Sequence, residues 1–168
     1  LSLVGQTTGY GFKQDGSGAI WYIQNGIPYR IIGTNSEPFL PISGWPEARV
    51  ICLSTDGDGH IWAGTTKGIA RWNNGRFEDQ TPNSDQPNVS VSALYCTRNG
   101  CWVFGDGKVR KWVDQHWVAE VDEKAWRELV GSNPLDLNAY RDRDGGLWFA
   151  HLGSGLFHIT EDGRTEHF

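Results

Sequence analysis

The chain has 168 residues, a net charge of −5 and a sequence pI of about 5.5, which argues against the basic footprint of a nucleic-acid-binding protein. It contains no apolar run of about 18 residues, so this segment is not expected to span or contact a membrane. Nine tryptophans and 22 glycines, with little helical periodicity, indicate many short strands joined by tight turns.

Residues 1–6 read as a strand that precedes the first repeat of the chain. We expect this strand to complete a neighbouring unit, so that the chain starts inside a larger ring. The absence of any Met, including an initiator, favours the same interpretation of a piece cut or processed from a longer protein.

A repeat begins after this segment and recurs four times. Its lead tryptophans lie 41, 40 and 46 residues apart, a period typical of repeat architectures, and are Trp21, Trp62, Trp102 and Trp148. An Asp/Gly-rich turn precedes each of them, except that the third repeat has lost one turn residue and carries Cys96 at the acidic position. The order within a repeat is strand, turn, tryptophan-led strand, glycine and third strand.

The first strands are expected at residues 10–13, 50–53, 92–95 and 137–140, and the third strands at 27–30, 69–72, 109–112 and 156–159. More polar fourth strands, suited to an outer edge, are expected at 76–79, 116–119 and 164–168, after hairpin turns at 73–75, 114–115 and 161–163. Four antiparallel strands per unit predict an all-β fold, a β-propeller, with blades at 7–44, 45–84, 85–121 and 122–168. The four lead tryptophans then fill the space between blades.

The connections between repeats are irregular. Residues 122–130 favour a short helix capped by Asp122, which explains the longest spacing. Cys96 and Cys101 flank a turn and either bond across the hairpin or pack as two small buried side chains. Because cross-strand disulfide geometry is demanding, we favour the second reading.

Residues 56–72 and 142–157 resemble the two-component regulator propeller repeat, whose pattern is roughly D-x-d-G-x-l-W-x-g-t-x-x-G-l. The resemblance is close in repeats two and four, weaker in one and three, and extends over essentially the whole chain. It implies a propeller, commonly seven-bladed, in the periplasmic or extracellular sensor region of a bacterial two-component signalling protein. There it implies binding of a ligand, often a carbohydrate fragment. We also expect a small-molecule or glycan ligand, or a protein partner, for this chain.

No catalytic residue, metal ligand or cofactor is predicted from the residue pattern. The pair Asp56 and Asp58 resembles the start of a calcium loop, but the twelfth position is Lys67, so turn formation is the preferred reading. The histidines show no zinc spacing, and no acid–base pair can be chosen from spacing.

Topology places the loops between strands two and three on the same face as the blade connections. The ligand-binding residues predicted on that face are Trp45, Lys67, Trp126, Arg127 and His151. Alternatively, Trp45 and Trp126 cover the ends of blades.

We expect a non-enzymatic binding module in a sensor, with a lectin-like or scaffold propeller, or a propeller lyase, as alternatives. An open arc would expose apolar blade faces, so the isolated chain is expected to self-associate.

Overall fold

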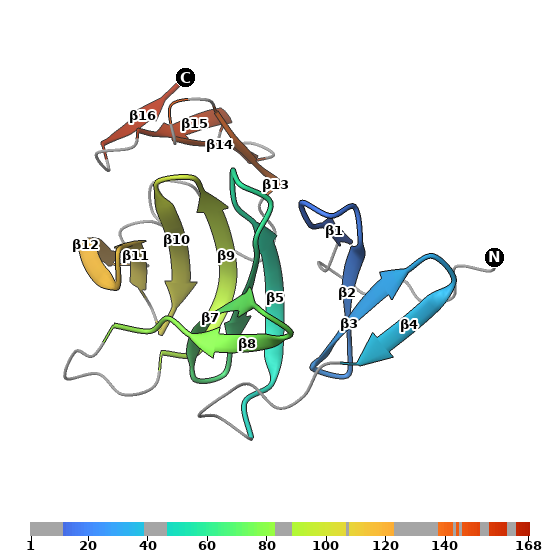
Figure 1. Cartoon of the computed structure of the whole chain (residues 1–168). Helices are drawn as coiled ribbons and strands as arrows, with labels where there is room; N and C mark the ends of the chain where they lie inside the picture. The colour runs from blue at the N-terminus through green and yellow to red at the C-terminus, as the bar shows by residue number, and fades with distance from the viewer. Residues whose placement is uncertain are drawn as a thin grey trace.

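A computed structural model of the chain describes residues 12–38, 47–82, 89–106, 108–122, 138–142, 144, 146–151, 155–160 and 164–168. These residues form four separate antiparallel sheets of four strands each (Figure 1). Among the described residues there is no helix, and so none that could cross a membrane.

Each sheet is built from four strands that follow one another in the chain. We call the sheets blades 1 to 4. Blade 1 contains β1 (Lys13–Gln14), β2 (Ile20–Gln24), β3 (Ile27–Ile32) and β4 (Asn35–Pro38), and blade 2 contains β5 (Val50–Thr55), β6 (Ile61–Thr65), β7 (Gly68–Asn73) and β8 (Arg76–Asp79). Blade 3 contains β9 (Val91–Thr97), β10 (Gly100–Gly105), β11 (Lys108–Val113) and β12 (His116–Asp122), and blade 4 contains β13 (Asn138–Arg141), β14 (Leu147–His151), β15 (Gly155–Ile159) and β16 (Thr165–His167).

This arrangement confirms the all-β fold of propeller blades that the repeat predicts. The described part of the first strand is shorter than expected, at Lys13–Gln14, and β12 runs on to Asp122. The expected strand at 1–6, the turn at 161–163 and the helix after Asp122 lie outside the described residues.

Hairpin turns adopt the backbone that their residues favour. Asn74 and Gly75 both have positive φ (46° and 88°), as a two-residue hairpin of mirror-image type requires. Asp114 and Gln115 do the same with φ of 45° and 64°, although neither is a glycine. Both turns therefore match their predicted positions.

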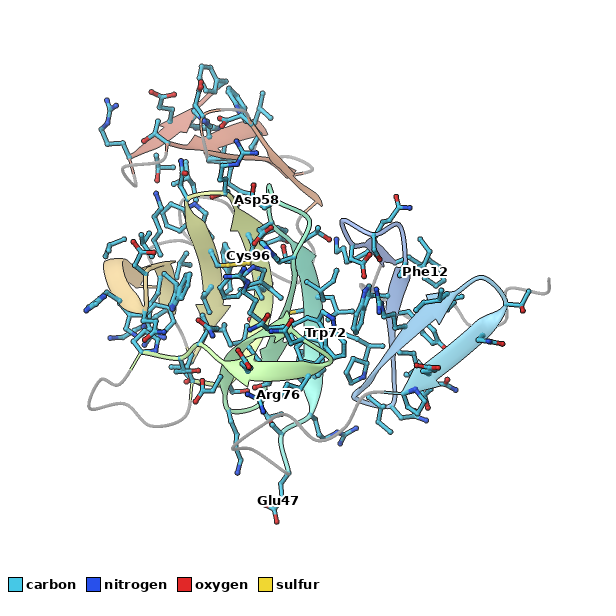
Figure 2. All side chains as sticks on the ribbon, in the orientation of Figure 1. Phe12, Glu47, Asp58, Trp72, Arg76 and Cys96 are labelled. Carbon is cyan, nitrogen blue, oxygen red and sulfur yellow. A yellow bond between two sulfur atoms is a disulfide. The ribbon has the colours of Figure 1, made fainter. Side chains whose placement is uncertain are left out.

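The core lies between blades rather than within them. Trp21 of blade 1 packs with Leu53, Ile61 and Phe77 of blade 2, and Figure 2 shows Trp72 at the same junction. The junction of blades 2 and 3 and that of blades 3 and 4 repeat this packing, with Trp62 and Trp102 in the place of Trp21. Burial of these apolar faces holds successive blades together.

Turns of neighbouring blades also touch through glycine. The Gly16 amide donates to the Gly59 carbonyl at 2.8 Å, between blades 1 and 2. A Cβ on Gly59 would lie 2.6 Å from the Gly16 Cα, and Gly59 has a φ of +84°. Only glycine therefore allows this close approach.

Cys96 and Cys101 form a disulfide across β9 and β10, where they stand directly opposite each other. The preferred reading of two unbonded side chains is corrected on this point. The turn in this blade is one residue shorter than in blade 2, which pairs the two cysteines at a Cα–Cα distance of 4.0 Å. Cys52 is a free thiol whose pKa burial raises to about 12.

Candidate functional site

An aspartate closes the turn before the lead tryptophan in blades 1, 2 and 4. In blade 2, one oxygen of Asp56 accepts the amides of Asp58 (2.9 Å) and His60 (3.0 Å), and the other accepts the Trp62 Nε1–H (2.9 Å). The same three bonds recur around Asp15, with Ser17, Ala19 and Trp21, and around Asp142, with Asp144, Gly146 and Trp148. We call this arrangement the Asp–Trp clasp.

These bonds stabilise the ionised carboxylate. Burial alone would raise the pKa of Asp15, but hydrogen bonds from Ser17, Trp21 and two amides outweigh it and lower the pKa to about 2. The pKa values of Asp56 and Asp142 are also lowered, because hydrogen bonds again outweigh the effect of burial, which would raise them. Each clasp therefore holds a negative charge at neutral pH.

A basic side chain stands opposite each lead tryptophan, on the third strand of its blade. The pairs in register are Trp21 with Arg30, Trp62 with Arg71, Trp102 with Lys111 and Trp148 with His158. The first three cations lie 5.6, 5.7 and 5.6 Å from the indole, within cation–π range, and the His158 ring stacks on Trp148 at 4.2 Å.

In blades 1 and 4 this basic group also binds the clasp carboxylate. Arg30 donates to Asp15 (3.2 and 3.1 Å) and to the Ser17 hydroxyl (2.9 Å). His158 Nε2 lies 2.8 Å from the Asp142 carboxylate, and its Nδ1 lies 3.1 Å from Glu166. Basic side chain, carboxylate and indole thus form one network in each of these blades.

Blade 3 lacks the carboxylate. The Thr97 hydroxyl accepts the Asn99 amide at 3.1 Å and so replaces one turn bond. It does not replace the acceptor for the indole, because the buried Trp102 Nε1–H finds no hydrogen-bond partner among the described residues. The disulfide fixes the turn that the clasp fixes elsewhere.

Blade 2 keeps the Asp–Trp clasp, but a histidine takes the place of the arginine beside the carboxylate. His60 Nδ1 lies 3.1 Å from the Asp56 oxygen that Arg30 occupies in blade 1, and Asp58 pairs with Arg98 of the next blade at 3.0 Å. Arg71 makes no hydrogen bond or ion pair with a described residue, and its Nε is buried. The acid opposite it on β8, Glu78, is held by Arg76 (3.0 and 2.9 Å) and Asn73 (2.9 Å).

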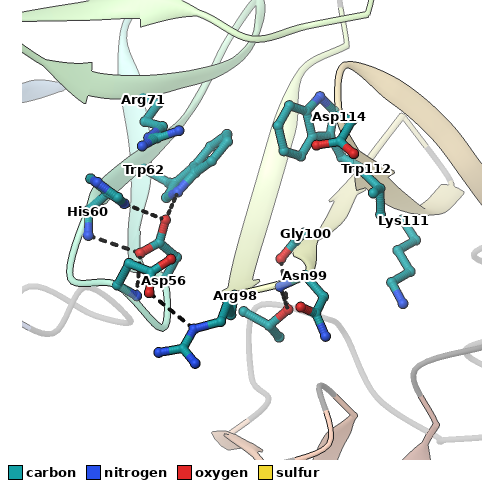
Figure 3. A pocket seen from close by; sticks show the side chains of 13 residues that line it. Asp56, His60, Trp62, Arg71, Arg98, Asn99, Gly100, Lys111, Trp112 and Asp114 are labelled. Carbon is teal, nitrogen blue, oxygen red and sulfur yellow. Dashed lines mark hydrogen bonds and ion pairs between the residues drawn. The ribbon is translucent and has the colours of Figure 1, made fainter.

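A pocket of about 440 Å³ opens between blades 2 and 3 at this point. Its blade 2 wall contains Asp56, His60, Trp62 and Arg71, and its blade 3 wall contains Arg98, Asn99, Lys111, Trp112 and Asp114. Trp62 of blade 2 and Trp112 of blade 3 meet edge to face, with ring centroids 4.8 Å apart, and Arg71 lies beside Trp62 (Figure 3). Its volume falls within the roughly 300–1,000 Å³ usual for small-molecule pockets.

One wall of the pocket brings together three groups of a kind that binds metals. Asp56, Asp58 and His60 each offer a ligand atom, and these atoms lie within 4.8 Å of one another. The Asp56 oxygens already accept hydrogen bonds within the turn, and Asp58 is paired with Arg98. Both carboxylates therefore already have partners: Asp56 within its turn and Asp58 across the junction between blades 2 and 3.

None of the residues predicted to bind ligand lines this pocket among the described residues. Two lie at the other ends of the sheets, and three fall outside the described residues. Lys67, partly buried, sits in the turn between β6 and β7, where its amide donates to the Thr65 hydroxyl. His151 ends β14, opposite Gly155. Both are at the sheet ends opposite the pocket turns, because consecutive hairpins of a meander alternate ends. Trp45, Trp126 and Arg127 fall outside the described residues.

The lead tryptophans differ in burial. Trp21, Trp62 and Trp102 are 0%, 3% and 2% exposed, but Trp148, expected in the core as well, is only partly buried. The first three each face a following blade, whereas Trp148 stacks on Phe168 of its own blade, 5.6 Å away.

Sequence reasoning missed Arg71 and Trp112. A signal was present, since a basic residue stands nine residues after the lead tryptophan in three repeats and ten residues after it in the fourth. The exchange of partners in blade 2 also has a sequence trace, His60 at the position of Ala19 and Asp58 at that of Ser17.

Comparison with known proteins agrees with this geometry. Residues 44–67, which include the blade 2 clasp, match the family model described as two component regulator propeller. The chain carries a two component regulator propeller repeat. No curated protein matches this chain in sequence.

Several solved structures share the fold of this chain. The extracellular domain of the putative hybrid two component system BT3049 from B. thetaiotaomicron is 16% identical with a TM-score of 0.63, over 99% of this chain and 23% of that one. The corresponding domain of BT4673, also from B. thetaiotaomicron, is 18% identical with a TM-score of 0.62, over 94% and 21%. A gluconolactonase, XC5397 from Xanthomonas campestris, is 17% identical with a TM-score of 0.59, over 94% and 61%. The chain therefore spans less than a quarter of these two extracellular domains.

Proposed function

We propose that this chain is part of the extracytoplasmic sensing region of a bacterial two-component regulator and that it binds a small molecule, a glycan or a protein without chemical turnover. The observation that carries the proposal is the regulator-propeller repeat at residues 44–67, on a fold shared with extracellular domains of two such systems. The Cys96–Cys101 disulfide supports a periplasmic or extracellular location, because disulfides persist in oxidising compartments.

The pocket between blades 2 and 3 supports binding rather than catalysis. General acid–base chemistry needs a carboxyl group or histidine that is available to a substrate. Asp56 instead accepts hydrogen bonds from its own turn and from Trp62, and His60 lies against Asp56. Among the described lining residues, the groups left to a ligand are a guanidinium, the Asp114 carboxylate and tryptophan edges. They favour recognition, because Asp114 has no second available carboxyl group or histidine as its partner in acid–base chemistry.

Thermal unfolding of the chain with a panel of saccharides, organic acids and amino acids tests this function. A binder raises the unfolding temperature with concentration, since it stabilises the folded state only. Mass spectrometry of the recovered molecule should show it unchanged. Conversion of the molecule would support an enzyme, and a panel without any binder would count against a small-molecule sensor.

A further inference from the structure

We propose that Arg71 anchors a small hydroxylated carboxylate in the pocket between blades 2 and 3. The inference rests on the proposed binding function and gives it a site and a ligand chemistry. Its first support is the state of Arg71, whose buried Nε has no hydrogen-bond partner among the described residues. Buried donors of this kind are rare in folded proteins, and a guanidinium donor is satisfied best by a planar carboxylate.

Blade 1 provides an internal comparison. Arg30 occupies the equivalent position, opposite Trp21 in register and 5.6 Å from its ring, and there its guanidinium is bound by Asp15 and Ser17. The protein can therefore satisfy an arginine at this position from within the blade. In blade 2 it does not, because His60 lies on the clasp oxygen and Asp58 is paired with Arg98.

The remaining pocket groups define the rest of the ligand. Asp114 lies on the blade 3 wall and, as a carboxylate, accepts hydrogen bonds from hydroxyl groups. Trp62 and Trp112, whose rings pack edge to face at 4.8 Å, give the pocket an apolar boundary. A molecule with a carboxylate at one end and hydroxyl groups along its chain can accept hydrogen bonds from Arg71 and donate them to Asp114.

The probes are gluconate and sorbitol, two six-carbon polyols that differ in the carboxylate. Titrations of the whole chain are followed by NMR at the indole N–H signals of Trp62 and Trp112. Gluconate should shift both signals and saturate, whereas sorbitol at the same concentrations should not. Equal binding of sorbitol would overturn the proposal.

Three variants make the assignment specific. Arg71→Gln should weaken gluconate binding about tenfold or more, since a charge-assisted contact is lost. Arg30→Gln, the matched control in blade 1, should bind as the parent does. His60→Ala keeps Arg71 but leaves the Asp56 oxygen open to it, as in blade 1, and should also weaken binding. An Arg71→Gln variant that is folded and binds gluconate unchanged would refute the site.

This test separates the two proposals. A neutral ligand that binds with full affinity to Arg71→Gln would refute the carboxylate site and leave the sensing function standing. Failure of every molecule in the panel to bind the parent chain would count against both.

Discussion

A buried tryptophan needs a hydrogen-bond acceptor for its N–H, and the Asp–Trp clasp supplies one from the turn that precedes it. Asp56 accepts from Trp62 and from two turn amides at once, so one side chain fixes both the hairpin and the indole. The acidic position of the repeat is therefore structural.

Replacing Asp56 with alanine should destabilise the protein by about 3 kcal/mol, because the Trp62 N–H and two turn amides lose a charged acceptor. Urea unfolding measures the change. Asp58→Ala is the control: its ion pair with Arg98 is exposed, so the expected loss is below about 1 kcal/mol. Similar losses in the two variants would contradict the clasp.

Lowered carboxyl pKa values make the fold sensitive to acid. The pKa of Asp15 is about 2 in the folded protein against 3.8 as the ordinary value, and the pKa values of Asp56 and Asp142 are also lowered. Their stabilisation is complete above pH 3.8 and is lost as the pH falls toward 2. Circular dichroism melts should show the unfolding temperature falling across this window, and Asp15→Asn should flatten the fall.

At this scale the sequence predicts the turns and lead tryptophans but not the partners of each group. The Asp/Gly pattern and the period are local, so they can be seen in the chain. Arg71 does not bind the clasp carboxylate because His60 contacts Asp56 and because Arg98 of the next blade binds Asp58. The first contact lies within one turn, but its effect on Arg71 is felt on another strand, and the second contact joins two blades.

Among the elements, blade 3 departs from its neighbours by using a disulfide in place of a carboxylate. Cys96 and Cys101 enclose a short hairpin, so closing the loop should stabilise the protein by about 2 kcal/mol in the chain-entropy account. The shorter turn is visible in the sequence, but the bond also depends on the strand register that places Cys96 directly opposite Cys101.

Thiol counting tests this element. The native chain should show no fast-reacting thiol, because Cys52 is partly buried and burial raises its pKa to about 12. Denaturation without reductant should expose one thiol, and with reductant three. A double variant, Cys96→Ala with Cys101→Ala, should unfold at about 2 kcal/mol lower stability and respond no further to reductant. Three thiols without reductant would contradict the disulfide.

Strand positions were predictable because the hairpins repeat, and β8 matches its expected range, Arg76–Asp79. The end of β12 was not, since the strand runs on to Asp122, which pairs with Lys108 in the sheet. The helix expected after Asp122 lies outside the described residues.

At the scale of the whole molecule, each of the two outer blades exposes a face whose counterpart in an inner blade is buried against a neighbouring blade. Phe12 lies on the first blade (Figure 2) and is 58% exposed. Leu53, at the same register in blade 2, is 7% exposed. Blade 1 covers Leu53, and in this chain the described residues leave Phe12 without such cover. This supports the proposal that the isolated chain self-associates.

Light scattering across a concentration series should give a mass above 18.8 kDa that rises with concentration. Phe12→Asp should shift the distribution toward the monomer. Val118→Asp, at a 57% exposed position on the outer strand of an inner blade, is the control and should not. A monomer at every concentration would mean that the blade faces need no partner.

The order of strands has a kinetic consequence. Every sheet pairs strands that are adjacent in the chain, so hairpins close short loops, and distant segments meet only when blades dock. Sheet structure can then form in any blade before its neighbours are in place, and stability accumulates by docking along a line. Inner blades, held on both faces, should exchange their amide protons last, and refolding should proceed outward from them.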